Sequence, residues 1–520
     1  MELILLAVVL VCWLCSLTVH LLWTLHMFQL NGYKPGVQRK WLRDNFLPAV
    51  IGRNLAAILS LPLLFCGWPG EILAALLLLL SAWLGRPKPK QVKKPLVYTP
   101  RVRRMLVTCG ILTLIPVAVS LAFWQMSWVW GLLLPLWHTA NGLWLLLANF
   151  INRPVETAIN RWYIEDASRM LREMPGLKVV GITGSYGKTS VKFFLQKLLS
   201  AKYNVLMTPE SYNTTLGVVK TIRQSLRATH EIFLCEMGAR NPGDIKEICD
   251  IVHPGYGIIT SVGPQHLESF KTVENVIRTK FELRDALPQD GTVFLNWDNE
   301  YIRSQQPGRP VVRYGIEQED ADYLAYDISV SAKGSSFKMK LDGEEHTFST
   351  RLIGSHNVLN IAGAIACAHT LGVPAADLIR QVRSLESVPH RLQLIQGRSA
   401  IIIDDAYNSN PSGAKAALDT LGAFDGDKIL VTPGMVELGS RQAELNRIFG
   451  SQAAEVCDYV ALVGEKQTEP ILEGLLAAGF PREKIFVEHD LKGALRSVEN
   501  LRTGGVQKIV LLENDLPDNF

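Results

Sequence analysis

The chain has 520 residues, of which 48% are hydrophobic, and its mean hydropathy is +0.14. This length suits three or four domains, and the hydropathy is high for a protein that is soluble throughout. Residues 1–150 hold 13 Lys and Arg against 3 Asp and Glu, whereas the remainder holds 40 against 46. The net charge of +4 therefore gives no sign of nucleic-acid binding, and the back half shows no basic patch with interleaved aromatic residues.

Five apolar stretches precede residue 151, at 3–28, 47–68, 71–84, 105–124 and 128–150. Because about 20 helical residues span the hydrocarbon core, they predict a multi-pass α-helical membrane region of about five spans. The stretch 71–84 is short and could instead be re-entrant. Gly67-Trp68-Pro69-Gly70 is expected to form the turn of one helical hairpin, and Gln125-Met126-Ser127 that of a second.

The distribution of Lys and Arg predicts how this region is oriented. The connections 29–46 and 85–104 carry 4 and 8 such residues, whereas the two hairpin turns and the extreme N-terminus carry none. The positive-inside rule then predicts a cell-membrane protein whose N-terminus lies outside the cell. Everything after residue 150 is expected in the cytoplasm. No cleaved signal peptide is expected, because Met1-Glu2 offers no basic segment.

A phosphate-binding motif follows the first strand of the back half, where β-branched runs alternate with helical stretches. The strand 177–183 leads into Gly184-Ser185-Tyr186-Gly187-Lys188-Thr189-Ser190, and a helix is expected over 191–199. In this arrangement the loop N–H groups and the helix N-terminus hold phosphates, the lysine reaches the β- and γ-phosphates, and the hydroxyl ligates Mg²⁺. The motif predicts binding of ATP with Mg²⁺.

The spacing of this motif points to a particular family. Ile182 stands where the common phosphate loop has its first glycine, and the glycines fall at 181, 184 and 187. This pattern resembles the Mur ligase and folylpolyglutamate synthase group. The resemblance continues in chain order through Asn213-Thr214-Thr215-Leu216-Gly217, Glu236-Met237-Gly238-Ala239, His266-Leu267-Glu268, Lys280-Phe281-Glu282, Asn296-Trp297-Asp298-Asn299 and Gly354-Ser355-His356-Asn357.

The resemblance implies a role for each of these positions. Lys188, His266 and Lys280 are expected to be catalytic. Thr189 and Glu236 would hold one Mg²⁺, while His266 and Lys280 (as a carbamate) would hold a second. The remaining assignments are ATP binding for Gly184, Ser185, Gly187, Ser190, Asn296 and Asn357, and substrate binding for Asn213 and Thr214. By itself, a histidine after a strand or a lysine on a helix is more often structural, so these roles depend on the ordered series.

A second α/β unit begins near Pro389-His390-Arg391, and its strand 400–403 delivers Asp404-Asp405-Ala406-Tyr407-Asn408-Ser409-Asn410-Pro411. Within the Mur ligases, this signature is most similar to members that add D-alanyl-D-alanine to a muramoyl tripeptide. The resemblance implies that Arg391 and Asp405 lie at the ATP, and Tyr407 and Asn408 at the substrate. Capping of the next helix is the alternative for Asn408 and Asn410.

Two departures from the family pattern lie near the expected amine site. Pro433-Gly434-Met435 lacks the aspartate that relatives carry, and Glu513-Asn514-Asp515 stands where they usually show Lys-Gly-Ser. The identity of the amine is therefore open.

The expected organisation is a membrane region at 1–150, a central ATP-binding domain at 151–388 and a C-terminal Rossmann-like domain at 389–520. The segment 151–176 is too short for the UDP-binding domain of the soluble muramoyl ligases. The resemblance implies an ATP-dependent amide ligase that forms an acyl phosphate and joins D-alanyl-D-alanine, or a similar amine, to a UDP-muramoyl-tripeptide-like carboxylate. The alternative acceptor is a lipid-linked envelope precursor. A transporter with an attached ATPase and a silent ligase-fold scaffold are further alternatives, and the oligomeric state is open.

Overall fold

The computed structural model describes residues 2–86, 95–210, 212–306, 308, 310–397, 400–407, 409–501 and 506–515. The chain divides into two compact units, the first ending at Arg161 and the second beginning at Trp162.

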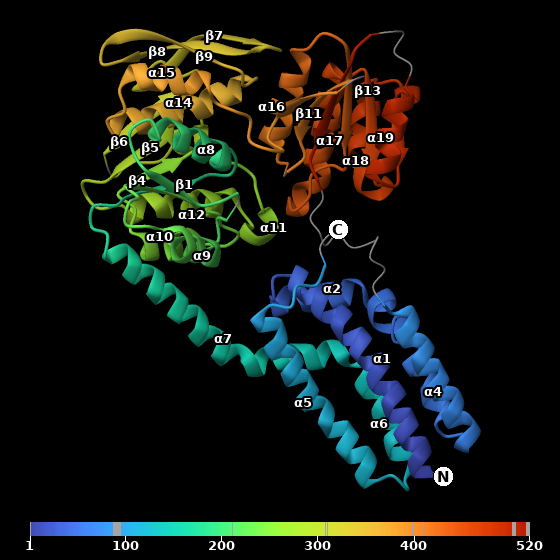
Figure 1. The fold of residues 1–520 in the computed structure, drawn as a ribbon. Helices are drawn as coiled ribbons and strands as arrows, with labels where there is room; N and C mark the ends of the chain where they lie inside the picture. The colour runs from blue at the N-terminus through green and yellow to red at the C-terminus, as the bar shows by residue number, and fades with distance from the viewer. Residues whose placement is uncertain are drawn as a thin grey trace. The chain divides into compact units, whose positions relative to one another are not determined.

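The first unit is helical. Its elements are α1 (Glu2–Leu30), α2 (Pro35–Asp44), the π-helical turn η1 (Phe46–Gly52), α3 (Leu55–Leu63), α4 (Gly67–Leu84), α5 (Pro100–Ala122), α6 (Ser127–Thr139) and α7 (Asn141–Arg172), the last of which continues into the second unit (Figure 1). Within the described residues, α1, α4 and α5 are long and apolar enough to cross a membrane. The number rises to as many as five if the bent pairs η1–α3 and α6–α7 each count as one span.

The turn expected at residues 67–70 is wrong. These residues form the first turn of α4, and α3 ends before them at Leu63. Proline is accepted in the first turn of a helix because its missing N–H would have no intrahelical partner there. Pro69 therefore lies in the first turn of a helix of 18 residues that begins at Gly67.

Buried polar side chains of the first unit bond to one another. His138 Nε2 lies 2.9 Å from Ser16 Oγ, and its Nδ1 lies 3.0 Å from Asn54 Oδ1. Asn141 donates to the same Asn54 oxygen and accepts a hydrogen bond from Thr24. Because a buried polar group without a partner is costly, this network fixes how α1, α3, α6 and α7 pack.

The second unit contains two sheets. The first has nine strands in the order β2-β3-β1-β4-β5-β6-β7-β8-β9, parallel from β2 to β7 and antiparallel from β7 to β9. The strands are β1 (Lys178–Thr183), β2 (Val205–Met207), β3 (Ile232–Glu236), β4 (Tyr256–Ile259), β5 (Thr292–Asn296), β6 (Val311–Gly315), β7 (Tyr323–Ser331), β8 (Gly334–Leu341) and β9 (Glu344–Thr350). The antiparallel insertion expected between 323 and 352 is confirmed as β7–β9.

Helices cover both faces of the parallel part of this sheet (Figure 1). One face packs against α8 (Lys188–Leu199), α14 (Ser355–Thr370) and α15 (Ala375–Arg383), and the other against α9 (Thr215–Ser225), α10 (Asp244–Val252) and α12 (Val273–Ala286). Successive strand residues point to opposite faces, as Leu234 and Phe233 of β3 show. The short helices α11 (Leu267–Phe270) and α13 (Glu300–Arg303) lie in connections.

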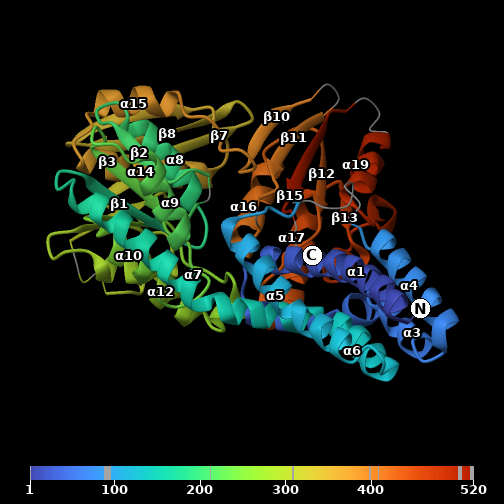
Figure 2. The same ribbon diagram turned by 60° about the horizontal axis from the view of Figure 1, so that its bottom comes forward.

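The second sheet has six strands in the order β10-β11-β15-β12-β13-β14, parallel except for β10 (Figure 2). Its elements are β10 (Gln393–Gln396), β11 (Ala400–Asp405), α16 (Pro411–Gly422), β12 (Asp427–Thr432), the 3₁₀ turn η3 (Gly439–Arg441), α17 (Gln442–Val456), β13 (Tyr459–Val463), α18 (Glu465–Ala477), the 3₁₀ turn η4 (Arg482–Lys484), β14 (Ile485–Glu488), α19 (Leu491–Asn500) and β15 (Lys508–Glu513). Both α/β domains of the expected fold class are therefore present.

The eight cysteines are all free. Cys15 and Cys66 of the first unit are exposed, and the other six are buried. In the second unit, burial, with nearby Asp250 and Glu282, raises the pKa of the Cys249 thiol to about 12.

Candidate functional site

The phosphate loop connects β1 to α8 at the carboxyl edge of the first sheet. Gly184 and Gly187 have φ values of +154° and +81°, which L side chains rarely adopt. A Cβ at Gly184 would lie 2.1 Å from Thr260 Oγ1, and one at Gly187 would lie 2.7 Å from Asn360 Oδ1. Glycine is therefore required at both positions by conformation and by space.

The loop is held against the connection that follows β4. The backbone N–H of Ser185 donates to the carbonyl of Ser261 at 2.9 Å, and that of Tyr186 donates to Ser261 Oγ at 2.8 Å. Ser185 Oγ also donates to the carbonyl of Gly263. These bonds fix the loop beside the N-terminus of α8, whose first turn contains Lys188, Thr189 and Ser190. The loop is therefore preorganised to bind an anion.

Lys188 has the lysine position of a phosphate loop. Its Nζ donates to the carbonyl oxygens of Gly184 at 2.7 Å and of Ser185 at 3.4 Å. Burial lowers the pKa of Lys188 to about 8, with Glu236 opposing this effect and Arg391 adding to it. The ammonium thus lies over the loop where the phosphates of a nucleotide would bind.

Glu236, at the end of β3, is fully buried and lies beside the first turn of α8. Its Oε1 accepts hydrogen bonds from Thr189 Oγ1 at 3.2 Å and from Asn213 Nδ2 at 3.0 Å. Burial alone would raise the pKa of Glu236, but the ammonium groups of Lys192 and Lys188 outweigh burial and hold the pKa below its usual value. A hydroxyl and an ionised carboxylate that meet in this way fit the oxygen ligands that Mg²⁺ prefers.

Lys192 is also part of this site, although it belongs to none of the motifs in the sequence. The side chain is fully buried, and its Nζ lies 3.0 Å from Glu236 Oε2. Lys192 lies four residues after Lys188, so both face the same side of α8. That spacing is the only signal in the sequence that could have indicated it.

Lys280, on α12, is 1% exposed. Burial lowers its pKa well below the ordinary value, the charge of Lys188 adds to this effect, and Glu282 and Asp244 oppose it. A solvated surface lysine, which the sequence left as the simplest alternative, is therefore excluded. Burial and the charge of Lys188 therefore favour the neutral, nucleophilic form of the Lys280 amine.

His266, expected at the second metal, contacts Glu437. The residue has a φ of +48° at the start of α11, and its Nδ1 lies 2.5 Å from Glu437 Oε2. The hydrogen bond with His266, aided by the charge of Arg240, lowers the pKa of Glu437 against the effect of burial. Glu437 follows Pro433-Gly434-Met435, the segment that lacks the aspartate of the relatives.

In the described part of the chain, no three or more His, Cys, Asp and Glu side chains gather closely enough to hold a metal ion. Thr189 and Glu236 are placed to offer two oxygen ligands, and Lys280 would add oxygen ligands as a carbamate.

The two asparagines expected near ATP bond to the backbone. Asn296 Nδ2 donates to the carbonyl of Thr260 at 2.8 Å, and Asn357 Nδ2 donates to the carbonyl of Ile353 at 2.8 Å. Both side chains are buried. Asn296 thereby braces the β4 connection against which the phosphate loop packs.

The C-terminal residues expected at ATP and substrate lie around the end of β11. The Arg391 guanidinium stacks 4.1 Å above the Tyr407 ring, and Asp405 accepts a hydrogen bond from the backbone N–H of Leu392. Burial raises the pKa of Asp405 to about 6, although Arg391 opposes this rise. Asn408 lies outside the described residues.

Two of the expected substrate and capping residues cap helices. Thr214 Oγ1 accepts from the N–H of Gly217 at the start of α9, and Asn410 Oδ1 accepts from the N–H of Gly413 at the start of α16. Thr214 also follows Asn213, which reaches Glu236, so the loop after β2 is brought to the phosphate site.

A phosphate loop, a strand-end carboxylate beside its hydroxyl and a second doubly wound domain define an ATP-using two-domain α/β enzyme. Residues 182–368 match the Mur ligase middle domain, and residues 390–512 match the Mur ligase glutamate ligase domain. The chain belongs to the Mur ligase family.

The relatives and solved structures that this chain resembles include several ligases that share one name. The UDP-N-acetylmuramoyl-tripeptide–D-alanyl-D-alanine ligase of Bacillus subtilis is 30% identical over 65% of this chain and 73% of its own length. The Escherichia coli ligase of the same name is 28% identical over 61% and 73%. MurF of Acinetobacter baumannii has a TM-score of 0.63 at 26% identity, covering 69% of this chain and 78% of that one. MurF of Thermotoga maritima, in complex with ADP, has a TM-score of 0.61 at 28% identity, covering 68% and 80%.

Proposed function

We propose that the chain is an ATP-dependent amide ligase of the MurF type, which joins D-alanyl-D-alanine or a similar amine to a UDP-muramoyl-tripeptide-like carboxylate in peptidoglycan precursor synthesis. The observation that carries this proposal is the convergence of Lys188, Thr189 and Glu236 on one point at the end of β1 and β3. The similarity to relatives of this activity supports the choice of substrates.

The reaction begins with attack of a substrate carboxylate oxygen on the γ-phosphorus of ATP, which forms an acyl phosphate and releases ADP. The amine nitrogen then attacks the acyl carbonyl, loses a proton, and phosphate leaves. Lys188 and the loop N–H groups are placed to stabilise the charge on the phosphate oxygens. When bound at Thr189 and Glu236, Mg²⁺ would supply further neutralisation of that charge.

Lys280 has the properties that carbamate formation requires. Its neutral amine can attack CO₂, forming an N–C bond and losing a proton, so that a buried base becomes a carboxylate-like anion. The product would place a negative charge near Lys188 where the uncharged amine had been, which suits the binding of a second cation.

A lipid-linked precursor is the second acceptor that we propose. It is favoured by the helical first unit, whose described residues contain three to five candidate membrane spans and which precedes the matched domains. An acceptor anchored by its lipid would need no pocket for a nucleotide. The Lys and Arg distribution supports a membrane protein with its N-terminus outside and its ligase domains in the cytoplasm.

Purified full-length protein in detergent should be offered ATP and D-alanyl-D-alanine with either the soluble UDP-muramoyl tripeptide or its lipid-linked counterpart. Phosphate release that requires both a carboxylate and an amine would support the ligase. Use of the soluble acceptor alone would remove the lipid-linked proposal. Phosphate release that needs neither substrate, or none at all with both acceptors, would contradict the proposed reaction.

A further inference from the structure

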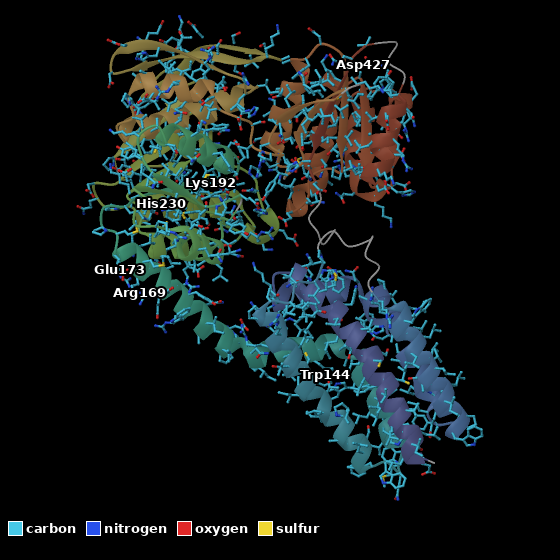
Figure 3. The ribbon with its side chains drawn as sticks, in the orientation of Figure 1. Trp144, Arg169, Glu173, Lys192, His230 and Asp427 are labelled. Atoms are coloured by element: carbon cyan, nitrogen blue, oxygen red, sulfur yellow. The ribbon has the colours of Figure 1, made fainter. Side chains whose placement is uncertain are left out.

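Two carboxyl side chains lie next to each other at the carboxyl edge of the second sheet. Asp405 ends β11 and Glu513 ends β15, and the two residues are register partners in these parallel strands. Register partners in neighbouring strands point to the same face of a sheet, so the two side chains adjoin. Asp427, which begins β12, marks the opposite edge of this sheet in Figure 3.

The two carboxyl groups differ in exposure and in partners. Glu513 is 1% exposed, and Ser409 Oγ donates to its Oε1 at 2.5 Å. Its Oε2 is also buried, and no N–H or O–H donor of the described residues reaches it. Asp405 is half-buried, accepts from the backbone N–H of Leu392 and lies near the Arg391 guanidinium. Asp405 therefore has the partners that stabilise a negative charge, which Glu513 Oε2 lacks.

A proton on Glu513 accounts for this arrangement. Two carboxylates that adjoin in a buried site repel each other, so such a pair holds a proton. Burial raises the pKa of Glu513 well above its usual range, and the charge of Asp405 adds to the rise. Because Ser409 donates to Oε1, the proton belongs on Oε2, from which Glu513 forms a hydrogen bond to Asp405.

We propose that Glu513 is a positioning residue, which remains protonated at neutral pH and donates a hydrogen bond that holds Asp405 as an ionised carboxylate for nucleotide binding. The inference rests on the proposed function, because it takes Asp405 as an ATP-binding residue. A carboxyl group can donate a hydrogen bond only when it is protonated, so ionised Glu513 could not perform this role.

The charged groups that face Asp405 determine how it titrates. Burial raises the pKa of Asp405 to about 6, Arg391 opposes the rise, and Asp404 adds to it. The hydrogen bond from Glu513 also opposes the rise, because it favours the ionised form. ADP affinity should therefore fall as the pH falls through about 6, where Asp405 loses its charge. Without the donor, this loss should occur at a higher pH.

Calorimetric titration of the full-length protein in detergent with ADP and Mg²⁺, between about pH 5 and pH 8, tests this role. Glu513→Gln can donate its amide N–H to Asp405 and accept from Ser409, so its pH profile should match that of the wild type. Glu513→Met has a similar volume but no donor. The midpoint of its profile should move up by about one pH unit, which makes its ADP affinity at pH 6 about fivefold weaker than that of the wild type.

Glu488→Gln is the matched control. Glu488 ends β14 of the same sheet, and its Oε1 accepts from Ser497 Oγ at 2.6 Å, but its register partner is Val463 and not a carboxyl group. This variant should keep the wild-type profile. The ADP phosphates titrate in the same pH range for every variant, so the comparison between variants isolates the titration of Asp405.

Infrared spectroscopy without nucleotide detects the proton itself. At neutral pH the wild type should show the carbonyl stretching band of a protonated carboxyl group, above the amide I band, and Glu513→Gln should lack it. If Glu513→Met does not fold, this band and the profile of Glu513→Gln still provide the test.

The contrary outcomes are distinguishable. If Glu513 were ionised, the infrared band would be absent, and both substitutions would remove a negative charge beside Asp405 and move the midpoint to lower pH. Either result would overturn the protonated Glu513. The band together with an unchanged midpoint in Glu513→Met would overturn the positioning role alone. A wild type that does not bind ADP at any pH would instead overturn the proposed function.

Discussion

Replacement of Lys280 by methionine should stabilise the fold while abolishing ligation. Methionine has a similar length and volume, so it can occupy the buried channel of a side chain that is 1% exposed without opening a cavity. It removes an amine whose pKa is lowered by burial and by Lys188. It also removes the only group at this position that could become a carbamate.

The size of the stabilisation follows from proton linkage. The pKa of Lys280 is lower in the folded than in the unfolded chain, so the unfolded chain binds more protons and stability rises with pH between the two values. Each pH unit in that window is worth about 1.4 kcal/mol. At pH 8 this linkage therefore lowers the free energy of unfolding of the wild type by up to about 3 kcal/mol relative to a variant with an apolar side chain, for an unfolded pKa near 10.4.

Thermal unfolding of both proteins in CO₂-free buffer, without nucleotide, measures this difference. The methionine variant should unfold a few degrees higher at pH 8, and its advantage should shrink as the pH rises towards 10. Lys197→Met should show no such pH-dependent difference. A methionine variant that is less stable at pH 8, or an advantage that does not change with pH, would refute a neutral buried amine at position 280.

Three further outcomes are expected. Lys188→Ala should abolish turnover while leaving thermal unfolding almost unchanged, which a coupled phosphate-release assay and calorimetry would check, and near-normal turnover would contradict its role. Gly184→Ala should lose ADP binding and destabilise the fold by roughly 2–4 kcal/mol, because its Cβ would lie 2.1 Å from Thr260 Oγ1 at a φ of +154°. An unchanged ADP affinity in a calorimetric titration would contradict this expectation. A cysteine placed at Gln125 should react with an impermeant maleimide in intact cells while one in the 86–104 connection is shielded, and the reverse pattern would overturn the orientation.

The phosphate loop could be predicted because its chemistry is local. Conformation, anion binding and the position of Lys188 all depend on one short segment between a strand and a helix. Glu236 was also predictable, since a residue that ends a strand next to β1 must lie at the same edge of the sheet. Its bonds to Thr189 and Asn213 follow from that placement.

Other features depend on contacts that sequence spacing does not reveal. Lys192 was missed because a lysine in a helix is ordinarily solvated, and only the fold shows that it faces Glu236. Asn296 and Asn357 could be recognised as parts of motifs. That their side-chain amides donate hydrogen bonds to backbone carbonyls could not be predicted. The Glu437–His266 contact joins residues 171 positions apart, so no local pattern indicates it.

Two misreadings concern short segments with ambiguous composition. Glycine and proline at 67–70 favour a turn, but the same residues are accepted in the first turn of a helix, as α4 shows. The strand β10 was not predicted because an antiparallel edge strand of four residues carries no clear alternation of polar and apolar residues.

The cysteine distribution makes this protein convenient for thiol labelling. The cysteines of the second unit are buried, and burial raises the pKa of Cys235 and Cys249, so few of these sulfurs would be thiolates at neutral pH. Only Cys15 and Cys66 are exposed. Replacing those two by serine should leave a nearly silent background, against which single cysteines introduced into either unit could carry a fluorophore or spin label without dismantling the folded core.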